Sequence, residues 1–271
     1  MKIKIFTLII FLTFLRGLFG AVQKTIIIHS ESMERDIPCV IILPDNYDIT
    51  DNQYAVIYLL HGYSGNYKNW SDKSDLGKYA DTYNIIIVCP DGGYNSWYLD
   101  SPMDLNCQYK TYVGKEVVQY IDQNYRTIVH RNSRAITGLS MGGHGALYLA
   151  LEFPDIFGAA GSMSGVVDLK LTTKKYELSE KIGSFEQFPE RWNQFSVMSN
   201  VHKFKYSNTR LMIDCGIDDV FFESNRFLHK TLLELNIPHD YSEKPGGHSW
   251  EYWINALNFQ ILFFIHSFKQ N

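Results

Sequence analysis

The sequence predicts an α/β fold with a mostly parallel central sheet and helices on both faces. Apolar runs typical of strands alternate with segments whose apolar residues recur at helical spacing. The runs at 54–60 and 85–89 are almost continuously apolar. Central strands of a parallel sheet have this pattern because both of their faces are buried. Residues 21–271 form a chain of about 250 residues, which fits a single domain of this kind.

The first twenty residues are typical of a signal peptide. A short basic start and an apolar run over residues 5–15 are followed by small residues suited to cleavage. The run is short for a bilayer span and Arg16 interrupts it, so a retained anchor is the less favoured alternative. We therefore expect a signal peptide at 1–20, one domain at 21–271, and a secreted or periplasmic protein with no stable membrane anchor after cleavage.

Charge and cysteine usage narrow the function further. The formal net charge is −4 and no basic stripe is present, so nucleic acid is not an expected partner. The four cysteines, Cys39, Cys89, Cys107 and Cys215, lack the C-x-x-C pairing typical of metal sites, and no metal is expected. Cys107 lies in a polar loop, whereas the other three lie in or beside apolar runs. We favour free thiols, although export also permits a disulfide.

The expected elements follow in chain order. Before residue 130, the apolar spacing places strands at 22–28, 39–43, 54–60 and 85–89, and helices at 76–83 and 111–125. After residue 150, strands are expected at 157–164 and 209–216, a short strand at 240–243, and a terminal helix at 250–268.

The stretch Gly138–Gly143 is the most distinctive of the chain. It joins an apolar run at 135–137 to a helix-like segment at 144–151, with glycine two places before and two places after Ser140. A strand, a tight turn and a helix in this order form the nucleophile elbow of α/β-hydrolases. The serine backbone is strained there, and side chains at the glycine positions would collide with the neighbouring strand and helix. We predict that Ser140 is a nucleophile; a glycine-rich turn with a helix-capping serine is the alternative.

The turn after the run at 54–60 supplies a second feature. Hydrolases of this fold place one oxyanion donor at the corresponding turn. The expected pair of N–H donors is Met141, which follows the nucleophile, and Tyr63. The side chain of His61 in the same turn is expected to be structural.

Two later turns supply the base and the acid. His248 lies in a glycine-rich loop before the terminal helix, where a general base can reach Ser140. The other histidines are expected on the surface or in packing, with His144 packed on the elbow helix. Asp218 and Asp219 both follow the strand at 209–216, and only one can point at the histidine. Asp214, inside that strand, is a weaker candidate.

Residues 166–200 interrupt the alternation of strands and helices. This stretch is charged at first and then aromatic, without clear strand character. A segment of this length between core strands is usually a functional loop or cap. We expect the 166–200 insert to govern substrate access, with surface decoration as the alternative.

These motifs together resemble the esterase D family of α/β-hydrolases. The family includes S-formylglutathione hydrolases, mycolyltransferases, tributyrin esterases, and the feruloyl and acetyl-xylan esterases of carbohydrate esterase family one. The resemblance covers the whole mature chain, and its motifs lie at 58–65, 90–92, 96–98, 138–143, 215–219 and 246–248. Family members read G-[TS]-x-D at the acid turn, which implies Asp219 as the acid, although Ile217 here replaces the usual threonine or serine.

The resemblance implies an exported serine carboxylic-ester hydrolase with a Ser140–His248–Asp219 triad, an acyl-enzyme and no cofactor. Trp97 and Tyr98 lie in a loop that resembles the segment near the site of polysaccharide esterases, so we expect them to bind substrate, although such rings also serve packing. The expected substrate is an acetyl or feruloyl ester on plant oligo- or polysaccharide. The alternatives are a broad short-chain carboxylesterase, an acyltransferase, and a carbohydrate-binding paralogue without activity.

Overall fold

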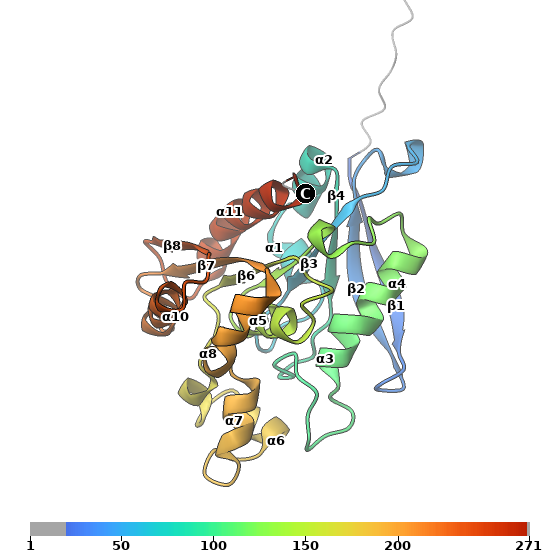
Figure 1. The fold of residues 1–271 in the computed structure, drawn as a ribbon. Helices are drawn as coiled ribbons and strands as arrows, with labels where there is room; N and C mark the ends of the chain where they lie inside the picture. Colours follow the sequence, from blue (N-terminus) through green and yellow to red (C-terminus); the bar gives the residue numbers. More distant parts are fainter. Residues whose placement is uncertain (1–19, 270–271) are drawn as a thin grey trace, which may run out of the picture.

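The computed structural model describes residues 20–269, so the expected signal peptide lies almost entirely outside the described residues. An eight-stranded sheet forms the centre of the molecule (Figure 1), in the order β1-β2-β4-β3-β5-β6-β7-β8. The strands are β1 (Val22–Ser30), β2 (Arg35–Leu43), β3 (Ala55–Leu60), β4 (Ile85–Pro90), β5 (Arg134–Gly138), β6 (Ala159–Met163), β7 (Arg210–Gly216) and β8 (Asp240–Lys244).

The sheet is mostly parallel, as predicted. The pairs β1–β2 and β2–β4 are antiparallel, and the five pairs from β4 to β8 are parallel. The chain passes from β3 to β4 on one side and then returns across β3 to form β5 on the other side. This reversal places the carboxyl ends of β3 and β5 next to each other. In open α/β sheets, ligands bind in the crevice at such a reversal of strand order.

Helices cover both faces of the sheet (Figure 1), and alternate residues of β3 enter two separate cores. Three helices pack on one face, namely α1 (Asn69–Lys73), α2 (Leu76–Tyr83) and α11 (Trp250–Lys269). The other face is covered by α3 (Tyr109–Thr111), a π-helical turn (Tyr112–Val117), α4 (Val118–Asn124), α5 (Met141–Glu152) and α10 (Phe222–Glu234). Short 3-10 turns also occur at Tyr47–Ile49 and Arg131–Ser133.

Two expectations about element bounds need correction. The helix expected at 111–125 begins at Tyr109 and contains the π-helical turn. The first two strands are longer than expected, and their ladder extends to the pair Ser30 and Arg35. Polar residues continue this antiparallel ladder because β1 is an edge strand, whereas the sequence prediction followed the apolar runs alone.

The 166–200 insert is helical. It contains a 3-10 turn (Leu169–Thr172), α6 (Leu178–Ile182), α7 (Pro189–Phe195) and α8 (Val197–Asn200). A further 3-10 turn (Val201–Lys203) and α9 (Phe204–Ser207) lead to β7. In Figure 1, α6 and α7 lie together at one end of the molecule, beyond α5 and α8. Helices this short are stabilised by packing rather than by propensity, and Trp192 and Leu178 are fully buried in the core on the α5 side.

All four cysteines are free and buried. The expectation of free thiols is therefore confirmed. Cys107, which was expected in a polar loop, is only 3% exposed and packs in the core. Cys39 and Cys89 lie on neighbouring strands, yet their side chains enter the cores on opposite faces of the sheet. Within residues 20–269, no helix combines the length and apolarity that crossing a membrane requires.

Candidate active site

Ser140 lies in the predicted elbow between the end of β5 and the start of α5. Its backbone has φ 53° and ψ −116°, a sparsely populated conformation for a residue with a side chain. A Cβ atom on Gly138 would lie 2.7 Å from the backbone of Gly142 and from Leu60 Cβ. The glycines are therefore required because the strand, the elbow and the end of β3 pack against one another through backbone atoms.

The structure brings His248 and Asp219 to this serine. His248 Nε2 lies 2.9 Å from Ser140 Oγ, and His248 Nδ1 lies 2.9 and 3.1 Å from the two carboxylate oxygens of Asp219. The carboxylate accepts from the imidazole Nδ1–H, so Nε2 is free to accept from the serine hydroxyl. This is the arrangement that activates a serine for attack.

Asp219 is held as an ionised acceptor. Its side chain is fully buried, and its Oδ1 also accepts a hydrogen bond from the Phe221 N–H at 2.8 Å. Burial by itself raises the pKa of this carboxyl, but the hydrogen bond and charge of His248, with the Phe221 N–H, outweigh burial and lower its pKa. Asp218 is exposed, and the buried carboxylate of Asp214 binds Tyr252 and Lys244 instead of the histidine.

Aromatic rings fix the imidazole plane of His248. Trp253 lies perpendicular to it at a centroid distance of 4.8 Å, and Phe221 lies at 5.3 Å. Trp250 then packs on Trp253 at 5.6 Å. These contacts restrict rotation of the imidazole, which supports its hydrogen bonds to the serine and the acid.

The two expected oxyanion donors are available. In the part of the chain that the structure describes, neither the Tyr63 N–H nor the Met141 N–H has a hydrogen-bond acceptor. Both follow turns at the adjacent ends of β3 and β5, and Met141 is the first residue of α5. Two unpaired N–H groups beside a nucleophile can stabilise the negative charge that develops on a carbonyl oxygen.

His61 has the structural role expected of it. Its Nε2 accepts a hydrogen bond from the Gly92 N–H at 2.8 Å, so its Nδ1–H donates to the Gly62 carbonyl at 2.8 Å. The side chain is buried, and burial lowers its pKa, which keeps the imidazole neutral. His61 thus joins the turns that follow β3 and β4 and holds the backbone that precedes Tyr63.

His144 also fulfils the packing prediction. It is fully buried on α5, stacks on Tyr148 at 5.7 Å, and its Nε2 lies 3.0 Å from the Phe195 carbonyl. Burial lowers its pKa to about 4.

A cavity of about 470 Å³ opens over Ser140 and His248. Most of its lining is aromatic or glycine backbone, and no lysine, arginine, aspartate or glutamate of residues 20–269 lines it. The cavity therefore suits a neutral, partly apolar group at the reacting carbon. The aromatic residues that line it are Tyr63, Trp97, Tyr176, Phe221, Trp250 and Trp253.

The two residues expected to bind substrate have different positions. Trp97 lines the cavity, whereas Tyr98 is fully buried behind its wall and does not line it. The Tyr98 ring is wedged between Gly92 and Gly145, where an added Cβ would lie 2.3 Å from it. Its hydroxyl donates to the His61 carbonyl at 3.0 Å. In this position Tyr98 is separated from the cavity, and its hydroxyl instead supports the turn that precedes Tyr63.

The insert contributes directly to the cavity wall through Tyr176 and Val166. Tyr176 packs on Tyr63 at 5.3 Å and on Trp97 at 6.3 Å, and its carbonyl accepts a hydrogen bond from the Trp97 indole at 3.3 Å. Tyr176 and Glu177 both have positive φ, at 63° and 53°. This strained pair turns the Tyr176 ring toward the site.

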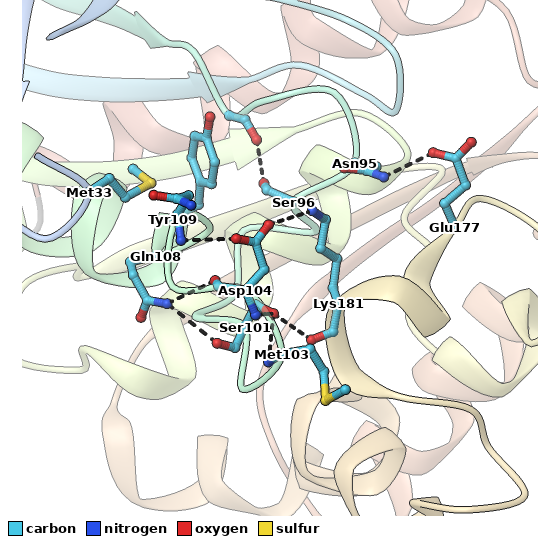
Figure 2. A network of polar contacts seen from close by, with 12 residues as sticks. Met33, Asn95, Ser96, Ser101, Met103, Asp104, Gln108, Tyr109, Glu177 and Lys181 are labelled. Atoms are coloured by element: carbon cyan, nitrogen blue, oxygen red, sulfur yellow. Dashed lines mark hydrogen bonds and ion pairs between the residues drawn. The ribbon is translucent and has the colours of Figure 1, made fainter. Parts of the chain in front are cut away.

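Polar contacts fasten the insert to the loop between β4 and α3, residues 91–108 (Figure 2). The Lys181 ammonium lies 3.1 Å from an Asp104 carboxylate oxygen, and this hydrogen bond lowers the pKa of Asp104. The Ser101 hydroxyl donates to the Lys181 carbonyl at 2.6 Å, and the Asn95 amide donates to Glu177 at 2.9 Å. The loop and the insert therefore form one wall of the cavity.

Four of the aromatic residues that line the cavity were not identified from the sequence. Phe221 follows the acid turn directly, and Trp250 and Trp253 lie one helical turn apart at the start of α11, a spacing that indicates a shared face. These signals were present in the sequence. Tyr176 had none, because its position depends on how the insert folds back.

The chain is similar to known esterases. Residues 30–264 match the model of a protein family described as "Putative esterase". An acetyl esterase of Caldicellulosiruptor saccharolyticus is 26% identical over 244 residues, which cover 83% of this chain and 91% of that protein. An esterase of Mycobacterium tuberculosis is 30% identical over 236 residues, which cover 77% of this chain but only 51% of that longer protein.

Solved structures give the same result for the fold. The structure of a ferulic acid esterase superposes on this one with a TM-score of 0.79 at 25% identity, covering 92% of this chain and 99% of that chain.

Proposed function

The chain belongs to this esterase family and is a serine carboxylic-ester hydrolase, and we propose that it is exported and removes acetyl or feruloyl groups from plant polysaccharide. Ser140 is the nucleophile, His248 the general base and acid, and Asp219 the carboxylate that orients the imidazole. One observation carries the assignment of residues: the unbroken chain of contacts from Asp219 through His248 to Ser140, beside two unpaired N–H groups.

In the acylation step, His248 Nε2 takes the Ser140 hydroxyl proton as Oγ bonds to the ester carbonyl carbon. The carbonyl oxygen becomes negative and accepts hydrogen bonds from the N–H groups of Tyr63 and Met141. Asp219 stabilises the positive imidazole that results. The carbon–oxygen bond to the alcohol then breaks, His248 gives its proton to the leaving oxygen, and an acyl-serine remains.

Water completes the cycle by the same route. His248 takes a proton from water as its oxygen bonds to the acyl carbon, and the same two N–H groups hold the second oxyanion. The bond to Ser140 Oγ breaks, the proton returns to Oγ, and the carboxylic acid is released. No further group is needed to balance these steps.

The substrate assignment is supported by the character of the cavity. A neutral lining of aromatic rings can stack on a feruloyl ring and on sugar faces, and it offers no charged partner to an anionic acyl group. The similarity to an acetyl esterase and a ferulic acid esterase points to the same two acyl groups. Export is supported by the pattern of residues 1–20.

The test compares kcat/KM on four esters, p-nitrophenyl acetate, p-nitrophenyl butyrate, methyl ferulate and acetylated xylan, with Ser140→Ala as the blank. A preference of at least tenfold for methyl ferulate or acetylated xylan supports the polysaccharide substrate. A preference for the p-nitrophenyl esters indicates a broad carboxylesterase, and turnover of none indicates a binding paralogue. Adding a sugar acceptor separates hydrolysis from acyl transfer, because transfer yields an acylated sugar in place of the free acid.

A further inference from the structure

A second carboxylate lies behind the acid turn. Asp214 is on β7 and fully buried, and both of its oxygens are engaged. One accepts a hydrogen bond from the Tyr252 hydroxyl, and the other pairs with the Lys244 ammonium. A buried carboxylate is stable only when it is paired in this way, so these contacts fix where Tyr252 and Lys244 lie.

The two partners of Asp214 bracket the loop that carries His248. Lys244 is the last residue of β8, and Tyr252 lies in the first turn of α11, so residues 245–251 span the distance between them. One carboxylate therefore holds both ends of this loop. The Lys244 ammonium also lies 4.2 Å from the Phe259 ring centroid, which further restricts its position.

The same loop is pressed against the turn that carries Asp219. The Asp218 N–H donates to the Gly246 carbonyl at 3.0 Å, and the Ile217 N–H donates to the Lys244 carbonyl at 2.9 Å. A Cβ on Gly216 would lie 2.1 Å from the Gly246 carbonyl oxygen. With backbones this close, a shift of the loop changes the distance between His248 and Asp219.

We propose that Asp214, with Tyr252 and Lys244, is a positioning group that sets His248 against Asp219 and Ser140. This inference rests on the proposed function, because it assigns the residues that hold the base of that reaction. Asp214 does not line the cavity, and its carboxylate binds Tyr252 and Lys244 rather than the imidazole, so we place its effect in the loop. Displacement of a catalytic group by about 1 Å can lower a rate by about 100-fold.

The test uses Tyr252→Phe in the full chain, since this change removes one oxygen atom and keeps the ring. We expect kcat on p-nitrophenyl acetate to fall about 10- to 100-fold at a KM within about twofold of wild type. The low-field proton resonance of the His248 Nδ1–H, measured without substrate, should shift or broaden. Lys244→Met should also lower kcat and change the low-field resonance. If Tyr252→Phe does not fold, the result for Lys244→Met tests the inference.

Tyr79→Phe is the matched control. The Tyr79 hydroxyl, on α2, also donates to a residue of α11, Asn258, at 2.8 Å, but it lies far along the helix from the loop. Its kcat and low-field resonance should match wild type. If the Asp214 partner variants keep kcat within twofold and leave the resonance unchanged, the inference is wrong, even if Tm falls. Turnover by Ser140→Ala would instead overturn the proposed active site. The low-field resonance of the His248 Nδ1–H would still test whether Asp214 positions the loop, so the two failures can be told apart.

Discussion

The carbonyl oxygen of His61 lies 2.5 Å from the position that a Cβ atom on Gly142 would occupy. This contact joins the turn that precedes the Tyr63 N–H to the first turn of the helix that follows the nucleophile. Direct contact between two backbones therefore helps to set the oxyanion donors, together with the side chains of His61 and Tyr98. The contact explains why a side chain at the second glycine of the elbow would strain this fold.

Gly142→Ala is expected to reduce both stability and activity. The added methyl group meets backbone oxygens of His61 and Leu60 that cannot rotate away, so the free energy of unfolding should fall by about 1–3 kcal/mol. Denaturant unfolding measures this change. Gly77→Ala in α2 is the control, because its Cβ would meet only Ala21 and an Asp75 oxygen at 3.1 Å or more, and its unfolding free energy should change by no more than about 1 kcal/mol. Equal losses in the two variants would contradict the argument.

Ser140→Ala should lower kcat by a factor on the order of 10⁶ while Tm stays within a few degrees of wild type. The reason is that the hydroxyl forms the acyl-enzyme and no neighbouring group can replace it. Ser162→Ala is the control, since Ser162 is also fully buried near the elbow but its hydroxyl has no partner among residues 20–269. Its kcat should stay within about twofold of wild type. Substantial turnover by well-folded Ser140→Ala would remove Ser140 from the mechanism.

Asp219→Asn and Asp218→Asn separate the two adjacent carboxylates. The first removes the charge that orients His248 through contacts of 2.9 and 3.1 Å, and kcat should fall about 10⁴-fold. The second changes an exposed side chain and should leave kcat within about twofold. Steady-state kinetics on p-nitrophenyl acetate measure both. A larger loss in Asp218→Asn than in Asp219→Asn would mean that the acid is assigned to the wrong residue.

Asp219 also predicts a pH dependence of stability. Its pKa in the folded protein is lowered, because His248 and the Phe221 N–H together outweigh burial. Its contribution to stability is therefore fully present above the ordinary aspartate pKa of about 3.9, and it is lost as pH falls through the lowered value. The difference in unfolding free energy, wild type minus Asp219→Asn, should decrease over that acid range. A difference that is constant or grows on acidification would contradict the lowered pKa.

Tyr176→Ala tests the role of the insert. The ring packs on Tyr63, Trp97 and Phe221, and it narrows the cavity beside the nucleophile. The variant loses the contact between this ring and the feruloyl ring, and such aromatic contacts are worth about 0.5–1.5 kcal/mol. The value of kcat/KM for methyl ferulate should therefore fall about 2- to 10-fold, while kcat/KM for p-nitrophenyl acetate should stay nearly unchanged. Tyr206→Ala, on α9 and 81% exposed, is the control and should change neither. A uniform loss on both esters would indicate a structural role for Tyr176.

The sequence by itself determined the fold class, the elbow and the candidate residues. Local chemistry was sufficient for these, because a strand, a strained serine turn flanked by glycines and a helix are encoded within Gly138–Gly143 and its neighbours. Apolar runs likewise marked the central strands of the sheet, whereas the edge strand β8 is mostly polar. His61 and His144 were also assigned correctly to packing, since neither lay in a loop suited to a general base.

Only the tertiary structure decided which of these residues meet. The adjacency of β3 and β5 arises from a reversal of strand order that local patterns do not record, and it brings together the turns that follow these two strands. Trp97 lines the cavity and its neighbour Tyr98 does not, because side-chain direction depends on the backbone, which has positive φ at both residues. Contacts between segments far apart in the chain determine three further features. These are the choice of Asp219, the location of Tyr176, and the pairing of Asp214 with Tyr252 and Lys244. Such contacts are fixed by packing of the whole fold, so the sequence indicates the chemistry and the tertiary structure determines its geometry.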